Sequence, residues 1–194
     1  MDIPITKQEF ELFQDYIYNN VGINLPPHKI TLVQSRLRKR VKELGLKSYG
    51  ELFEVIKKDR SGDELAILIS SISTNVTSFF REKGQWDFLK TEILNIIKKK
   101  NTKRLRIWSA GCSSGQEPYT VAMFLHETLQ NISSCDIKIL ATDISEKVLK
   151  LAIEGEYREK DILDLDRNLV HKYFEPMIDK KEQRVYRIKD FLKK

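Results

Sequence analysis

Small residues in the middle of the chain have the types and spacing of a cofactor-binding turn. Residues 109–115 read Ser-Ala-Gly-Cys-Ser-Ser-Gly and follow a short apolar stretch. Gly111 and Gly115 would let backbone amides approach a ligand, and a helix beginning after them would present its positive end to it. The spacing is not GxGxxG, and glycines also occur at such turns for packing alone. The turn by itself therefore leaves both interpretations open.

Asp143 is the acidic residue that could complete such a site. It lies 32 residues after Gly111, about one strand–helix–strand step, and closely follows the apolar segment 137–141. An acidic side chain at the carboxyl end of a second parallel strand can accept hydrogen bonds from ribose hydroxyls. Alternatively, Asp143 caps the next helix, where Ser145 is a competing cap. The turn and the acid together favour an adenosine-type ligand.

A polar stretch ahead of the turn carries further side chains that could bind a ligand. Residues 75–81 read Asn-Val-Thr-Ser-Phe-Phe-Arg and interrupt a helical region. Their polar groups can bond to backbone or to a ligand. The alternative is a helix–helix connection in which Asn75 and Thr77 are caps and Phe79 and Phe80 belong to the core.

The elements that must position these residues are of two kinds. The first hundred residues are predicted to be all helical, from capping boxes at Thr6 and Ser48 and from apolar residues at helical spacing. From Arg104 onward, strand and helix patterns alternate, which favours a parallel α/β sheet. The expected helices cover about residues 6–21, 29–44, 48–56, 65–72, 86–100, 118–129, 145–152 and 166–173, and the expected strands about 105–108, 137–141 and 184–188.

Composition is that of a cytoplasmic globular protein. Hydrophobic residues make up 41% of the chain and charged residues 32%, which argues against a disordered protein. No segment approaches the roughly 18 apolar residues of a membrane span, and the N-terminus lacks the layout of a signal peptide. Cys112 and Cys135 fit a reducing compartment, and their spacing predicts no metal site.

Basic residues concentrate in the second predicted helix and the residues beside it. Residues 29–47 hold seven basic residues and one acidic residue, and the whole chain has a net charge of +6. Such a segment suggests an acidic partner, either nucleic acid, anionic lipid or an acidic protein surface, although a solvated helix face is the plainer alternative. Nucleic acid is the weakest of these because neither a recognised motif nor interleaved aromatic residues accompany the charges.

The three motifs, taken together, resemble the chemotaxis receptor glutamate methyltransferase family, CheR. The resemblance runs from about Gln8 to Phe191, and it rests on residues 75–81, 108–119 and 141–144, with support from Arg36-Leu37, 44–46 and 154–157. It implies a helical N-terminal domain over residues 1–84. It also implies part of a class I S-adenosylmethionine-dependent (Rossmann-like) methyltransferase domain over 85–194, with a small β-subdomain at about 154–190. The fold class is therefore mainly α plus α/β.

The resemblance also implies the site. By position, the cofactor-binding residues are Asn75, Thr77, Arg81, Ala110, Gln116, Glu117, Asp143 and Ile144. Arg81 is the candidate catalytic residue, which would orient a carboxylate of the substrate or of the cofactor. The family usually has a glutamate where this chain has Gln116, so the charge attraction for the cofactor is lost there. Glu117 either substitutes for that glutamate or steadies the helix.

The activity implied is methylation of glutamate side chains on chemoreceptor cytoplasmic helices, with S-adenosylmethionine as donor and S-adenosylhomocysteine as product. Arg36, Lys39, Arg40 and Lys42 match the face that binds the receptor in the family. We expect a cytoplasmic monomer that binds no nucleic acid, inserts in no membrane and uses no metal.

The C-terminal part departs from the family pattern. The family continues with an Asn-Leu cofactor contact and an Asp-x-Ile-x-Cys-Arg-Asn-Val strand, and neither occurs here. Two core strands are predicted, fewer than a class I methyltransferase sheet contains. The sequence therefore predicts a chain truncated within the cofactor domain. The alternative function is a non-catalytic receptor-binding module that acts through the basic helix.

Overall fold

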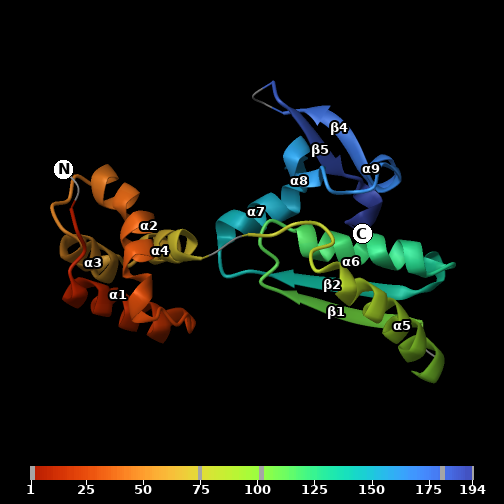
Figure 1. The fold of residues 1–194 in the computed structure, drawn as a ribbon, viewed down its shortest axis with the longest axis horizontal. Coiled ribbons are helices and arrows are strands. Elements are labelled where there is room, and N and C mark those ends of the chain that lie inside the picture. The colour runs from red at the N-terminus through yellow and green to blue at the C-terminus, as the bar shows by residue number, and fades with distance from the viewer. Residues whose placement is uncertain (1–2, 74–75, 101–102, 180–181, 194) are drawn as a thin grey trace. The chain divides into compact units, whose positions relative to one another are not determined.

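The computed structural model describes residues 3–73, 76–100, 103–179 and 182–193. The chain divides into two compact units, residues 1–74 and residues 75–194 (Figure 1). Each unit has its own hydrophobic core. Among the described residues, no helix combines the length and the apolar character needed to cross a membrane.

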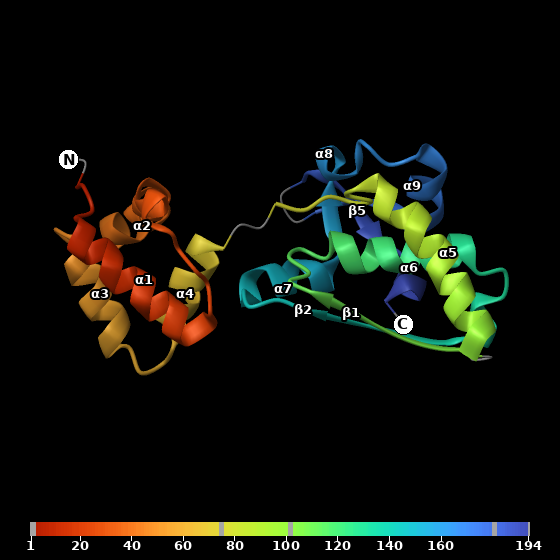
Figure 2. The same ribbon diagram turned by 60° about the horizontal axis from the view of Figure 1, so that its bottom comes forward.

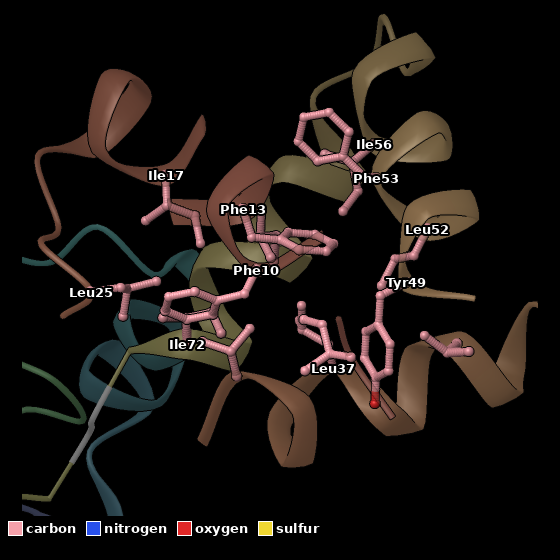
Figure 3. Packing of buried hydrophobic residues seen from close by; sticks show 14 residues of the cluster. Phe10, Phe13, Ile17, Leu25, Leu37, Tyr49, Leu52, Phe53, Ile56 and Ile72 are labelled. Carbon is pink, nitrogen blue, oxygen red and sulfur yellow. The ribbon is translucent and has the colours of Figure 1, made fainter. Parts of the chain in front are cut away.

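The first unit is a bundle of four helices around an aromatic core. Its helices are α1 (Lys7–Val21), α2 (Ile30–Glu43), α3 (Tyr49–Lys58) and α4 (Asp63–Ile72), with a short 3-10 turn at Pro27–Lys29. Phe13, Ile17 and Leu52 are fully buried in this core, and Phe13 meets Phe53 edge to face at 5.5 Å between ring centroids (Figure 3). The bundle matches the helices predicted from apolar spacing.

The capping box predicted at Thr6 is present, and it does more than begin helix α1. The Thr6 hydroxyl accepts from the Glu9 N–H, and the Glu9 carboxylate accepts from the Thr6 N–H at 2.8 Å. Its other oxygen accepts from the Gly50 N–H at 2.7 Å, which ties α1 to the start of α3. These hydrogen bonds hold the pKa of Glu9 below its usual value, against the opposing effect of burial. The carboxylate therefore stays ionised.

The second unit begins with a parallel β–α–β arrangement. Helix α5 (Lys83–Lys100) precedes β1 (Arg104–Ala110), α6 (Gln116–Thr128), β2 (Asp136–Thr142) and α7 (Glu146–Glu154). Strands β1 and β2 pair in parallel, with Ala110 opposite Thr142. Helices α5 and α6 lie over one face of this sheet (Figure 2), and Leu105 and Ile107 pack with their apolar residues. Alternate residues point the other way, as a strand requires, and leave Trp108 67% exposed.

The same unit ends in a small antiparallel sheet. Its strands are β3 (Glu156–Arg158), β4 (Phe174–Ile178) and β5 (Arg184–Ile188). Helices α8 (Glu159–Ile162) and α9 (Arg167–Tyr173) lie between β3 and β4 in the chain, and a 3-10 turn at Asp190–Leu192 follows β5. The strand order is β3-β5-β4. We call residues 156–188 the β-subdomain. Its core residues Tyr157, Tyr173 and Phe174 pack against Met123 of α6. The predicted fold class, helical and then α/β with a small β-subdomain, is confirmed.

The division between the units differs from the predicted boundary at 84/85. It falls between residues 74 and 75. Phe79 packs its ring edge to face on Tyr157 and Phe174, at 4.9 and 5.4 Å between centroids. Because this aromatic contact buries Phe79 in the second core, residues 76–84 belong with the cofactor domain and not with the helical bundle.

Candidate functional site

The turn that follows β1 is fastened to the end of β2. The backbone N–H groups of Gly111 and Cys112 both donate to the Thr142 carbonyl at 2.8 Å. The Trp108 indole N–H donates to the Thr142 hydroxyl at 2.9 Å. Gly111 has a positive φ of 79°, and a Cβ built there would meet nothing within 4 Å. The outer side of the turn is therefore open to a ligand.

Asp143 joins this turn to the helix that follows β2. One carboxylate oxygen accepts from the Ser113 N–H at 2.8 Å, and the other accepts from the Ser145 N–H at 2.9 Å. The sequence left open whether Asp143 binds a ribose or caps the next helix. In the structure Ser145 is the N-cap of α7 (Glu146–Glu154), and Asp143 accepts from its backbone N–H. The hydrogen bond from the Ser113 N–H in the turn was not predicted. Each carboxylate oxygen can accept a second hydrogen bond, so Asp143 can still receive hydroxyl groups.

The start of α6 holds Gln116 and Glu117 in different ways. Gln116 is 6% exposed, and its side-chain oxygen accepts from the Ser114 hydroxyl at 2.8 Å. Glu117 accepts from the Ser109 hydroxyl at 2.6 Å. Since Ser109 belongs to β1, Glu117 fastens the helix to the strand, which is the steadying role considered from the sequence. Ala110 and Ile144 are exposed beside the turn and beside Asp143.

The loop that carries Thr77 and Arg81 is folded against α6. The Phe80 N–H donates to the Thr120 hydroxyl at 3.2 Å, and that hydroxyl donates to the Gln116 carbonyl at 2.6 Å. The Arg81 guanidinium donates to the Val76 carbonyl at 3.2 Å, while the Arg81 carbonyl accepts from the Trp86 indole at 2.9 Å.

Two of the predicted cofactor contacts in this loop are half-buried or exposed. Thr77 is half-buried, and the Arg81 side chain is 62% exposed. The Arg81 Nε lies 4.0 Å from the Glu82 Oε1, so the guanidinium already faces one exposed carboxylate of its own chain. Asn75, the third predicted contact from this stretch, lies outside the described residues.

Cys112 lies buried in the turn. Burial, with the nearby charge of Asp143, raises the pKa of the Cys112 thiol, which stays protonated at neutral pH. Within the described ranges, no three His, Cys, Asp or Glu side chains are grouped so that they could hold a metal ion.

The predicted receptor-binding residues on α2 fall into two groups. Lys39 and Lys42 are exposed, and the Lys39 Nζ lies 3.5 Å from the Glu43 Oε1. Arg40 is different, because its guanidinium forms an ion pair with Glu64 of α4 and its side chain is 23% exposed. The Arg36 guanidinium donates to the Ser71 carbonyl at 3.3 Å. Arg40 thus helps to hold α2 on α4, a role that helical spacing did not predict.

These features define a class of protein. A parallel β–α–β unit with an open glycine turn and an acidic residue after its second strand is the arrangement by which α/β domains bind nucleoside cofactors. Its groups suit S-adenosylmethionine, since Asp143 can accept from a ribose and Arg81 can pair with a carboxylate.

Two family models match the chain. One is described as CheR methyltransferase, SAM binding domain, over residues 75–194, and the other as CheR methyltransferase, all-alpha domain, over residues 8–73. The chain therefore belongs to the CheR methyltransferase family, and S-adenosylmethionine is the cofactor of its second domain.

Several similar proteins are named chemotaxis protein methyltransferases. A chemotaxis protein methyltransferase of Borreliella burgdorferi is 43% identical over 200 residues, covering 100% of this chain and 69% of that protein. Chemotaxis protein methyltransferase 2 of Vibrio cholerae is 34% identical, covering 89% of this chain and 60% of its own. The protein of Escherichia coli is 31% identical, covering 89% and 58% respectively. The chain thus spans between 58% and 69% of the length of these three relatives.

Some residues of the site were not predicted to have a role. Thr120 and Tyr157 each hydrogen-bond to the backbone of the loop or the turn. Tyr157 lies within the matching segment 154–157, which was the only signal available for it in the sequence. Thr120 carried no signal, because its role depends on a contact with a residue 40 positions away.

Proposed function

We propose that this protein transfers a methyl group from S-adenosylmethionine to glutamate side chains of chemoreceptor cytoplasmic helices. The observation that carries the proposal is the fastening of the glycine turn to Asp143, which places a carboxylate beside an open backbone turn. The family membership supports methyl transfer, and the relatives named for chemotaxis support a receptor as substrate. The proposed location is the cytoplasm, and the proposed state is a monomer.

The chemistry requires positioning more than acid–base catalysis. A glutamate side chain has a pKa of about 4.3 and is ionised at neutral pH, so no general base is needed. A carboxylate oxygen forms a bond to the methyl carbon as the carbon–sulfur bond breaks, and the neutral thioether S-adenosylhomocysteine leaves. The protein aligns the two groups and excludes water. The exposed guanidinium of Arg81 is the proposed group that orients a carboxylate.

Cofactor binding by the polypeptide of residues 1–194 is expected to be weaker than by the longer Borreliella burgdorferi relative. The Asn-Leu and Arg-Asn contacts of the family are not in this sequence. Each lost hydrogen bond to a charged or polar group costs about 1.5–3 kcal/mol, so two such losses weaken binding by about two decades or more. Calorimetry with S-adenosylhomocysteine, on this chain and on the Borreliella burgdorferi relative, measures the difference.

Equal affinities of the two polypeptides would contradict a contribution of these contacts to cofactor binding. Transfer of a labelled methyl group to receptor cytoplasmic fragments then separates the two candidate functions. Receptor binding without transfer, even at saturating cofactor, would favour the alternative of a non-catalytic binding module.

The exposed basic face of α2 is the proposed receptor-binding surface. Lys39→Glu with Lys42→Glu is expected to abolish pull-down of receptor cytoplasmic fragments, because both side chains are exposed and receptor helices of this type are acidic near their methylation sites. Arg40 is left unchanged, since reversing its charge would break the pair with Glu64 and destabilise the bundle.

A matched control makes the same change of charge elsewhere in the bundle. Lys57→Glu with Lys58→Glu alters two exposed lysines in the last turn of α3. The control is expected to bind the receptor, with weakening limited to the change in overall charge. Equal loss in both variants, or wild-type binding that does not weaken as salt rises, would exclude α2 as the specific surface.

A further inference from the structure

Tyr157 connects the β-subdomain to the cofactor turn. It lies in the middle of β3, opposite Tyr186 of β5. Its hydroxyl donates to the Ser114 carbonyl at 2.8 Å, and its side chain is 3% exposed. Ser114 lies in the turn between Ser113, which donates to Asp143, and Gly115, which precedes α6. A residue of the β-subdomain thus bonds directly to the backbone of the turn.

The ring of Tyr157 also contacts the loop that carries Thr77 and Arg81. It meets the ring of Phe79 edge to face at 4.9 Å between centroids, and Phe79 lies between Thr77 and Arg81 in the chain. A Cβ built on Gly115 would lie 2.9 Å from the Tyr157 hydroxyl oxygen. The turn, the loop and β3 therefore meet at this one side chain.

The hydroxyl has the chemistry of a permanent donor. Burial raises the pKa of Tyr157 far above its ordinary value, so the group does not ionise in any physiological condition. A neutral phenol in this position must donate to a carbonyl or leave a buried polar group unpaired. The bond to Ser114 satisfies it.

We propose that Tyr157 is a positioning residue for the cofactor turn, through which the β-subdomain holds the turn in the conformation that binds S-adenosylmethionine. The proposal extends the proposed function, since it concerns the affinity of the same site. Tyr157 acts on the turn through the backbone of Ser114 and on the loop through the ring of Phe79. The fold of the β-subdomain then sets the affinity for cofactor.

The test removes one hydroxyl and keeps the ring. Tyr157→Phe is compared with Tyr119→Phe, because the Tyr119 hydroxyl also donates to a backbone carbonyl at 2.8 Å, that of Ala152 in α7. The two variants lose the same kind of hydrogen bond, but only one of these bonds reaches the turn. Amide hydrogen exchange is followed by mass spectrometry on peptides that cover residues 109–117, without any ligand.

Amide exchange in the turn is expected to become about five- to tenfold faster in Tyr157→Phe, because the loss of one hydrogen bond lowers the local stability of the turn by a factor of this size. In Tyr119→Phe, exchange in the turn is expected to stay within about twofold of wild type. The dissociation constant for S-adenosylhomocysteine is expected to rise about five- to tenfold in Tyr157→Phe alone. Unchanged exchange in the turn, or equal effects in the two variants, would overturn the proposal.

The exchange arm does not depend on the proposed function. If wild-type protein binds no S-adenosylhomocysteine, the cofactor part of the proposed function fails, while exchange in the turn still reports whether Tyr157 holds it. If Tyr157→Phe does not fold, amide hydrogen exchange of the wild-type protein at increasing urea concentrations tests whether β3 holds the turn. Turn and β3 amides must then open together, and a turn that opens while β3 stays protected would refute the proposal.

Discussion

Gly115→Ala is expected to destabilise the second unit by about 2–4 kcal/mol, through backbone strain together with overpacking. Gly115 precedes α6 with φ +92°, a conformation that L side chains rarely adopt. An added Cβ would also lie 2.9 Å from the Tyr157 hydroxyl and 3.0 Å from the Ala152 Cα. The contact with a backbone atom cannot be relieved by a change of rotamer, so α6 and α7 would have to move apart.

Urea unfolding followed by tryptophan fluorescence measures this effect. Both tryptophans, Trp86 and Trp108, lie in the second unit, so the signal reports that unit alone. Gly111→Ala is the matched control, because Gly111 has φ +79° in the same turn and its added Cβ meets nothing. The control is expected to lose only the strain energy, about 1–2 kcal/mol. Equal losses in the two variants would show that close packing at Gly115 is not the cause.

Local signals were enough to predict most of the helices and both parallel strands. In α1 the cap at Thr6 and the spacing of Phe10, Phe13 and Ile17 act within a few residues, and the helix forms where they indicate. Strands β1 and β2 were predicted a few residues short of their observed bounds. Their ends depend on pairing between Arg104 and Asp136, and between Ala110 and Thr142, which periodicity within one strand does not contain.

The short strands of the β-subdomain show where local signals fail. Strand β3 has three residues, too few for an alternating pattern. Strand β4 contains Pro176, which argues against a strand in general and is tolerated here because β4 lies at the edge of its sheet. Of the three strands, β5 alone was predicted, over Arg184–Ile188.

The candidate site was predicted by residue type but not by its bonds. The sequence singled out Asp143, Gln116 and Glu117 as cofactor contacts. In the structure Asp143 accepts from two backbone N–H groups, and Gln116 and Glu117 each accept from a serine hydroxyl. The bond from Ser113 to Asp143 spans 30 residues, so it depends on how β1 and β2 align. Their roles toward cofactor remain predictions.

Asp143 has a bonding pattern that an asparagine cannot reproduce. Its two carboxylate oxygens accept from two different N–H groups, those of Ser113 and Ser145, at 2.8 and 2.9 Å. Asparagine has one acceptor oxygen, and its NH₂ group would face the second N–H donor. One N–H is then left without its partner, and the negative charge available to a ribose is lost as well.

Asp143→Asn is therefore expected to cost about 1.5–3 kcal/mol of stability in the second unit, and to weaken binding of S-adenosylhomocysteine by tenfold or more, about 1.4 kcal/mol.

Asp166→Asn is the matched control, since Asp166 caps α9 and accepts from the Asn168 N–H at 2.7 Å through one oxygen. Asparagine caps a helix about as well as aspartate, so the control is expected to stay within about 0.5 kcal/mol of wild type. Urea unfolding and calorimetry measure the two effects separately. If Asp143→Asn behaves like its control in both, the carboxylate neither holds the turn nor binds the ribose. If stability falls while affinity is unchanged, Asp143 holds the turn but does not bind the ribose.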